Sequence, residues 1–179
     1  MTFQITRISK GCNTPLETSG FVNLMCEYLQ QKYSETAIKN GLLYDLMGQI
    51  SAMEKHAILA YNAQRDKRGE IVRHTFHPKG IAYFRLRENE GKKTIDCGIE
   101  HIFTKEGSIG TEVMLINNVV GEIKDFCRGL KIASPTHIKI DFPRYANKDL
   151  ERYFDLGFEL FKETEDKIIL KSRISSLKH

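Results

Sequence analysis

The chain has 179 residues, of which 41% are hydrophobic and 28% are charged. These values favour one globular domain, expected over residues 1–172 and followed by a flexible tail over residues 173–179. No apolar run reaches the ~20 residues that span a bilayer. The first ten residues show no secretory signal, so we expect a cytoplasmic protein without membrane contact.

The charged residues point to an anionic ligand more than to nucleic acid. The chain carries 27 Lys and Arg against 23 Asp and Glu, a net charge of +4. The basic residues neither cluster on one helix nor alternate with aromatics, which disfavours a nucleic-acid partner. The four cysteines form no CxxC pair, and His74 and His77 have no nearby cysteine or carboxylate. We therefore expect neither a disulfide framework nor a metal.

The first third of the chain predicts a strand and two helices. The strand is expected over residues 3–8. Thr14 and Glu17 form a capping-box pattern, which predicts a helix that continues to about Tyr33. A second helix is expected from Ser34 or Glu35 to about Met53, although two internal glycines weaken it by about 1 kcal/mol each.

The middle of the chain predicts strands joined by polar turns. They are expected over residues 57–63, 71–76, 80–87 and 94–104. In the third of these, Ile81 and Tyr83 would share one face, with Ala82, Phe84 and Leu86 on the other. In the fourth, alternation would place Ile95, Cys97, Ile99, His101 and Phe103 on one face. Glu100 would then lie on the face opposite His101.

The last third alternates helices and strands. A helix is expected from Ile109 or Gly110, with Gly129 as the residue just past its end. A strand over residues 137–142 and a short helix over 147–156 follow, and Gly157 ends that helix. Two strands over 158–161 and 167–170 complete the chain. This order predicts an α/β domain with a mixed (α+β) sheet.

The turn before the long helix raises a question of function. It reads KEGSIGTE, from Lys105 to Glu112. A helix N-terminus carries free N–H groups and partial positive charge, which favour an anion. Gly107 and Gly110 would allow positive φ and a close approach of the ligand. Neither a Walker loop nor a dinucleotide fingerprint occurs. The turn is therefore either a phosphate cradle or only a tight turn.

The element order, this turn and the segment ANKDLERYFDLGFEL (residues 146–160) together resemble the GNAT N-acetyltransferase superfamily. The resemblance covers residues 1–171 by element order. It implies a GNAT-like fold, a central mixed β-sheet of about six to seven strands flanked by four helices. In that family a Q/R-x-x-G-x-G/A turn holds the pyrophosphate of acetyl-CoA. A later segment of form N-x-x-A-x-x-x-Y-x-x-x-G-F follows it.

This chain departs from the family pattern in identifiable places. In the turn, Lys105 replaces Gln or Arg, Ser108 replaces the first glycine and Gly110 is kept. A shifted register would instead place Glu112, a carboxylate, where the pyrophosphate should lie. Asn147 is one residue away from the usual asparagine position.

The resemblance also implies a donor site. Acetyl-CoA would be the co-substrate, and no metal would be needed. Backbone groups of Ile102 and Phe103 would pair with its pantetheine arm. The remaining residues expected to hold acetyl-CoA are Lys105, Gly107, Ser108, Ile109, Gly110, Thr111 and Asn147.

The implied activity is transfer of an acetyl group to an amine on a small molecule or a protein. Tyr153 stands four residues before Gly157, as in the family, and would protonate the departing thiolate. Glu100 would accept the proton of the amine, with Asp96 and His101 as weaker alternatives. A catalytically inactive GNAT-like binding or regulatory module is the alternative. The sequence does not identify the acceptor, and it leaves open whether the protein forms a homodimer through its sheet edges.

Overall fold

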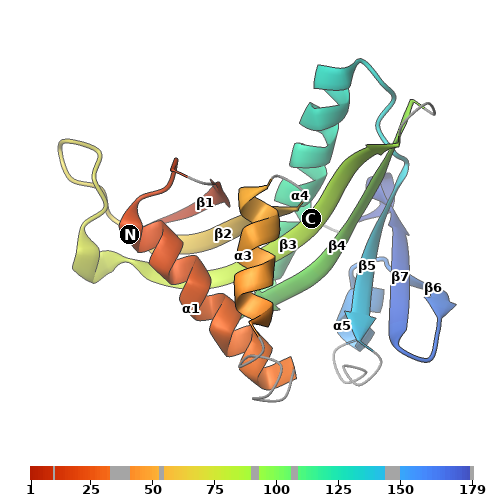
Figure 1. Ribbon diagram of the computed structural model, residues 1–179, viewed down its shortest axis with the longest axis horizontal. Coiled ribbons are helices and arrows are strands. Elements are labelled where there is room, and N and C mark those ends of the chain that lie inside the picture. Colours follow the sequence, from red (N-terminus) through yellow and green to blue (C-terminus); the bar gives the residue numbers. More distant parts are fainter. Residues whose placement is uncertain are drawn as a thin grey trace.

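The computed structural model describes residues 1–9, 11–32, 41–52, 55–89, 93–105, 109–143 and 150–177 (Figure 1). The expectations for Gly107, Ser108 and Asn147 lie outside these ranges. The seven strands form one sheet in the order β1-β2-β3-β4-β5-β7-β6. Their bounds are β1 Thr2–Ile8, β2 His56–Ala63, β3 His77–Asn89, β4 Thr94–Thr104, β5 His137–Pro143, β6 Glu159–Glu163 and β7 Lys167–Arg173.

Neighbouring strands are antiparallel except β4 and β5, which are parallel. The expected mixed sheet is therefore confirmed. The described residues include four helices beside it: α1 Pro15–Lys32, α3 Leu42–Ser51, α4 Ile109–Leu130 and α5 Leu150–Asp155. Helices α1 and α3 cover one face of β1–β4, while α4 and α5 lie on the opposite side of the sheet (Figure 1).

Local sequence signals explain the start of α1. The backbone N–H of Thr14 donates to Glu17 Oε2 at 2.9 Å, and the N–H of Glu17 donates to Thr14 Oγ1 at 3.3 Å. The capping box predicted from these two residues is confirmed. Glu17 is buried and also accepts a hydrogen bond from the hydroxyl of Tyr61 on β2 at 2.7 Å. The cap therefore also fixes α1 to the sheet.

The expected strand over residues 71–76 is wrong. Arg65 and Ile71 form an isolated bridge, and residues Arg73–Thr75 form a 3₁₀ turn. Thr75 explains the difference, because its hydroxyl donates to the carbonyl of Val72 and accepts from the N–H of Gln64. These local hydrogen bonds replace a strand ladder.

A β-bulge in β4 overturns the expected alternation of that strand. On β3, Tyr83 is opposite His101, but the next residue, Phe84, is opposite Ile99, so Glu100 is the extra residue. Ile99 therefore packs in the core beneath α4, whereas Phe103 packs in the core beneath α1 and α3. His101 shares the face of Phe103 and not that of Ile99. A bulge redirects side chains in this way at one position of a strand.

The C-terminus of α4 differs from the expectation that Gly129 follows the helix. Gly129 lies inside α4, and Lys131 takes the left-handed conformation with φ 55°. The N–H of Ile132 then donates to the carbonyl of Cys127 at 3.0 Å, as in a Schellman motif. Glycine usually occupies this position because it has no Cβ to clash.

We expect Lys131→Gly to stabilise the protein by about 0.5–1 kcal/mol, because it relieves the left-handed strain at this residue. Urea unfolding would measure the change. The matched control is Lys124→Gly in the helical interior of α4, which should cost about 1 kcal/mol. Equal effects of the two substitutions would contradict the assignment of Lys131 as the cap.

The C-terminal segment packs on the core. Of the expected tail, residues 173–177 are described: Arg173 ends β7, Ile174–Ser176 form a 3₁₀ turn, and Leu177 is buried. Gly157 has φ 95°, and a Cβ on it would lie 2.9 Å from the carbonyl oxygen of Ser176. Glycine is therefore required where α5 meets this turn.

In the part of the chain that the structure describes, no helix is both long enough and apolar enough to cross a membrane.

Candidate functional site

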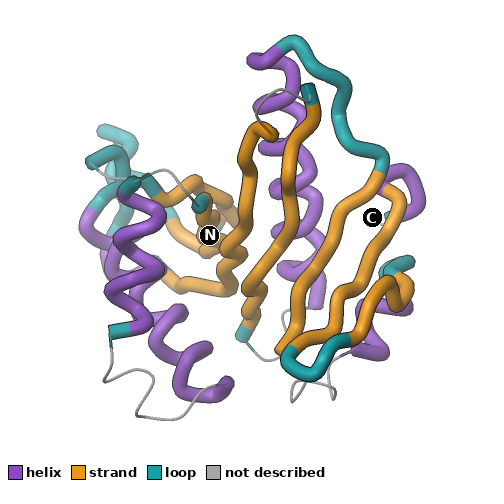
Figure 2. The backbone as a smooth tube through the Cα atoms, turned by 45° about the vertical axis from the view of Figure 1, so that its right-hand side comes forward, coloured by secondary structure: helices purple, strands orange, loops and turns teal. Residues whose placement is uncertain are grey.

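The parallel strands β4 and β5 diverge in the middle of the sheet (Figure 2). Among the described residues they share a single register pair, Ile99 with Ile140. Past this pair, Ile102 and Phe103 have buried side chains, and their backbones pair with β3 on the other side. No described residue of β5 is in register with them. The β5-facing edge of β4 can therefore accept an extended ligand.

Helix α4 starts close to the end of β4, as expected. Gly110 has ordinary helical backbone, so it does not use the positive φ that a glycine would allow there. An ideal Cβ on Gly110 would have nothing within 4 Å, whereas the next residue, Thr111, is buried. The first turn thus leaves room at Gly110, and its N–H groups favour an anion. Lys105 is exposed, and its ammonium lies 3.9 Å from Glu27 Oε2.

Glu112 points away from solvent and joins α4 to α5. Its side chain is 3% exposed, and Oε1 accepts hydrogen bonds from the hydroxyl of Tyr153 and from Arg152 Nη2, the latter at 3.2 Å. The shifted motif register would have aimed this carboxylate at a pyrophosphate. In the structure it faces Tyr153 instead.

Tyr153 is fully buried and packs against Phe142 and Phe158. Burial and the neighbouring Glu112 carboxylate raise the pKa of Tyr153 well above its ordinary value, against the opposing effect of Arg152. Loss of its proton would leave a phenolate next to a carboxylate, so Tyr153 is neutral near pH 7. The general-acid role of Tyr153 stays a prediction.

Glu100, the bulged residue of β4, is the centre of an ionic network. Lys55 Nζ and Arg85 Nη1 both lie 2.5 Å from Glu100 Oε1. Arg85 Nε also lies 2.6 Å from Asp96 Oδ2. No described residue hydrogen-bonds Glu100 Oε2. That oxygen can accept a proton from an amine or a water molecule, and the role of Glu100 as a base stays a prediction.

His101 lies beside Glu100 and is half-buried between two tyrosines. Its Nδ1 is 2.9 Å from the hydroxyl of Tyr28, and the Tyr28 and Tyr83 rings lie 5.3 and 5.5 Å from its own ring. Burial, helped by Lys55, lowers the pKa of His101 from 6.5 to about 4, although Glu100 opposes the shift. His101 is therefore neutral near pH 7.

This lowered pKa predicts a loss of stability in acid. The unfolded chain binds the proton of His101 as pH falls below 6.5, but the folded protein resists protonation until about pH 4. The contribution of neutral His101 to the free energy of unfolding is therefore fully present above pH 6.5. It is lost as the pH falls from 6.5 to 4, and the loss is about 3 kcal/mol. Urea unfolding across this range, compared with His101→Gln, would show a shallower decline in the variant. Equal slopes in the two proteins would contradict the prediction.

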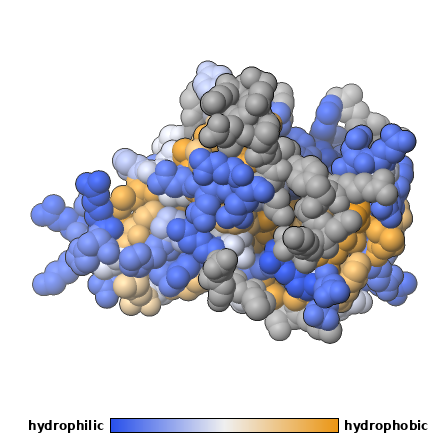
Figure 3. All heavy atoms as spheres, turned by 90° about the horizontal axis from the view of Figure 1, so that it is seen from below, coloured by the Kyte–Doolittle hydropathy of each residue, from blue (hydrophilic) through white to orange (hydrophobic). Residues whose placement is uncertain are grey.

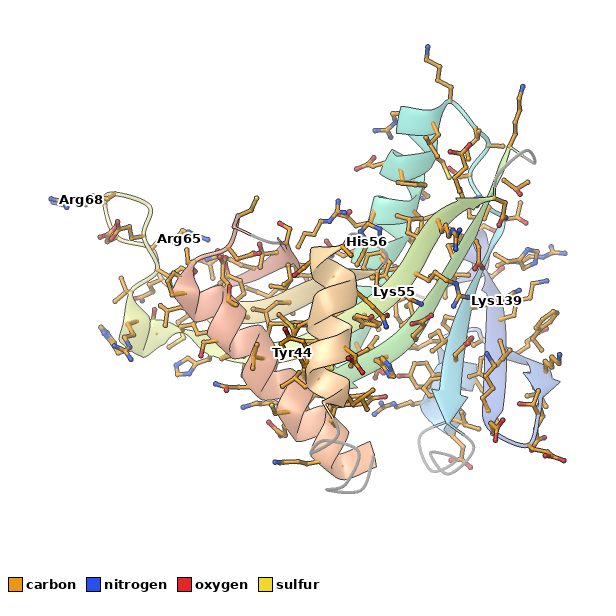
Figure 4. All side chains as sticks on the ribbon, in the orientation of Figure 1. Tyr44, Lys55, His56, Arg65, Arg68 and Lys139 are labelled. Carbon is orange, nitrogen blue, oxygen red and sulfur yellow. The ribbon has the colours of Figure 1, made fainter. Side chains whose placement is uncertain are left out.

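Sequence reasoning missed the two cations of the network. Lys55 precedes β2 (Figure 4), and Arg85 lies on β3. Neither stands in a motif, and only the sheet places them against Glu100. Basic residues on an otherwise apolar strand, as in YFRLR at 83–87, are the one signal that could have drawn attention to Arg85. Among the described residues, no group of three metal-binding side chains occurs.

Comparison with known proteins finds similarity to solved structures only. No family model and no curated protein matches this sequence. Solved structures match along nearly the whole chain at low identity. Arabidopsis thaliana NAA60 in complex with acetyl-CoA has a TM-score of 0.62 at 12% identity, covering 97% of this chain and 99% of that one.

Two other solved structures match this chain over a similar length and at a similar identity. A GNAT family acetyltransferase from Elizabethkingia anophelis with acetyl-CoA bound has a TM-score of 0.53 at 14% identity, covering 96% of this chain and 98% of that one. An aminoglycoside 6'-acetyltransferase type Ii has a TM-score of 0.55 at 14% identity, covering 96% and 97% of the two chains.

Proposed function

The chain has the GNAT fold, and from this premise we propose that it is an N-acetyltransferase that uses acetyl-CoA and an amine acceptor. The observation that carries the proposal is the divergence of β4 and β5 past their single register pair, next to the first turn of α4. This arrangement offers strand hydrogen bonds to an extended arm and a helix N-terminus to an anion. Acetyl-CoA has both parts.

The donor would bind with its pantetheine arm along Ile102 and Phe103 and with its pyrophosphate at α4. The described residues Lys105, Ile109, Gly110 and Thr111 would supply this end of the site. Gly107, Ser108 and Asn147 belong to the same proposal. The neighbours solved with acetyl-CoA support it.

The transfer would be direct. The amine attacks the thioester carbon, the new C–N bond forms, and the C–S bond breaks to release the thiolate. Glu100 Oε2 takes the amine proton, directly or through water. Tyr153 gives its proton to the thiolate. To do so, its hydroxyl must break its hydrogen bond to Glu112 and donate to the sulfur instead. Lys55 and Arg85 hold the Glu100 carboxylate in place.

Calorimetric titration with acetyl-CoA tests the donor site. We expect saturable micromolar binding of acetyl-CoA and of free CoA. Gly110→Asp should weaken it by tenfold or more, because a carboxylate would enter the open space at the α4 N-terminus. Gly110→Ala is the control and should bind within about twofold, since its Cβ meets nothing within 4 Å. Absence of binding up to millimolar ligand would overturn the proposal.

One observation favours the inactive module as a second candidate. The hydroxyl of Tyr153 is already occupied by Glu112 in a fully buried setting. A structure with acetyl-CoA bound would decide between the two. If Tyr153 still donates to Glu112 beside the bound thioester, the module is favoured. If the hydroxyl faces the sulfur, the enzyme is favoured.

A further inference from the structure

No helix of the described residues covers one sheet face of β5, β7 and β6 (Figures 1 and 2). On β5 and β7, residues alternate between buried positions that face α4 and partly exposed positions on this open side. The exposed positions include four basic or imidazole side chains, joined by a phenyl ring from β6. We call this set the basic face: His137, Lys139, Phe161, Lys171 and Arg173.

Phe161 is the centre of the basic face. A bulge in β6 places it between Leu160, which is opposite Leu170, and Lys162, which is opposite Ile169. Phe161 is 50% exposed, and the ammonium groups of Lys139 and Lys171 lie 5.1 and 4.9 Å from the centroid of its ring. Two like charges therefore meet over one apolar ring. Hydrophobic atoms are visible among hydrophilic ones at this end of the molecule (Figure 3).

The two lysines have no acidic partner in the described part of the chain. No described carboxylate lies within 4.0 Å of either ammonium, although Glu159 is opposite Lys171 in the strand register. Asp141, also on β5, is already paired with Lys167 at 2.9 Å. Lys139, Lys171 and Arg173 outnumber Glu159, the acidic residue on the same side, so the basic face is net positive and an anion would complement it.

A hollow beside the ring gives the anion space. Its volume is about 410 Å³, and its lining includes His137, Phe161, Lys171 and Arg173 together with one carboxylate, that of Glu159. Partial burial, together with the charges of Lys171 and Arg173, lowers the pKa of His137. That direction agrees with a positive local potential. The volume is in the range of ordinary ligand pockets.

The basic face lies next to the proposed reaction centre. A Cβ on Gly98 of β4 would be 3.6 Å from the carbonyl oxygen of Lys139, and Glu100 is two residues further along β4. Lys55 and Lys139 lie on either side of β4 in Figure 4. Adjacent strands are about 4.8 Å apart, so β7 is about 10 Å from β4. An extended peptide covers that distance in about three residues.

We propose that the acceptor is an extended acidic peptide, whose amine lies at Glu100 and whose carboxylates, about three residues away, bind the basic face. This rests on the proposed function, since it assigns the acceptor of the same site. A second copy of the chain fits less well. Antiparallel pairing of two β6 strands about Phe161 would place Glu159 opposite Glu163.

Two peptides of equal length test the proposal. One has Asp or Glu at positions 3 to 5 after a free N-terminal amine, and the other has Ala there. Fluorescence anisotropy measures binding without acetyl-CoA, and thiol release measures transfer with it. We expect the acidic peptide to bind at least ~10-fold more tightly, to lose this advantage at high salt, and to have the higher kcat/KM.

Charge reversal locates the contact. Lys139→Glu with Lys171→Glu should remove the preference for the acidic peptide and leave acetyl-CoA affinity unchanged. The control is Lys124→Glu with Arg128→Glu, the same total charge change on α4 across the sheet, which should keep the preference. Equal binding of both peptides, or tighter binding of single-stranded nucleic acid, overturns the proposal.

The outcomes also distinguish a failure of the acidic-acceptor proposal from a failure of the proposed transferase activity. If the acidic peptide binds through Lys139 and Lys171 but no thiol is released, the basic face is a peptide-binding site and the proposed transferase activity is wrong. If thiol is released at the same rate with both peptides, the protein is a transferase but the proposed preference for an acidic acceptor is wrong.

Discussion

Glu100→Gln should reduce kcat for acetyl transfer by about 10²–10⁴-fold, the range that one general base contributes. The amide keeps the shape of the side chain but cannot take the amine proton at Oε2. Affinity for acetyl-CoA should stay within about twofold, because the proposed donor site consists of the backbone of β4 and the first turn of α4. Stopped-flow or steady-state thiol release would measure kcat, and calorimetry would measure the affinity.

Asp96→Asn is the matched control for this prediction. It also removes a carboxylate that pairs with Arg85, at 2.6 Å, but Asp96 does not share the bulge of β4. We expect it to lower kcat by less than tenfold. If Asp96→Asn costs as much as Glu100→Gln, the network acts by positioning Arg85, and Glu100 is not the base.

Tyr153→Phe should have two separable effects. Stability should fall by about 1–3 kcal/mol, because Glu112 stays buried and loses the hydroxyl that donates to it. The rate of transfer should fall by about 10²–10⁴-fold if the hydroxyl protonates the thiolate. Urea unfolding measures the first effect, and kcat measures the second.

The Tyr153→Phe, Glu112→Gln double variant separates these effects. A neutral amide is less costly to bury than a carboxylate, so the double variant should recover part of the stability lost in Tyr153→Phe. It should not recover kcat. Recovery of kcat together with stability would show that Tyr153 supports the fold and is not the acid.

The sequence by itself determined the elements whose signals are local. The capping box of Thr14 and Glu17 predicts the start of α1. Period-2 alternation predicts the bounds of β4 and the central residues 80–87 of β3. Gly157 marks the end of α5 because it supplies a positive φ that other residues resist. The element order, together with the KEGSIGTE turn and the segment over residues 146–160, then indicated the GNAT fold.

Only the tertiary structure decided the faces and partners within the site. One extra residue at Glu100 turns His101 and Phe103 to the other face of the sheet, and a period-2 pattern contains no sign of such an insertion. Lys55, Arg85 and Glu100 are brought together by strand pairing between distant segments. Glu112 reaches Tyr153 across 41 residues because both side chains are buried where α4 meets α5. Periodicity is a property of neighbours along the chain, whereas charge pairing and burial depend on neighbours in space.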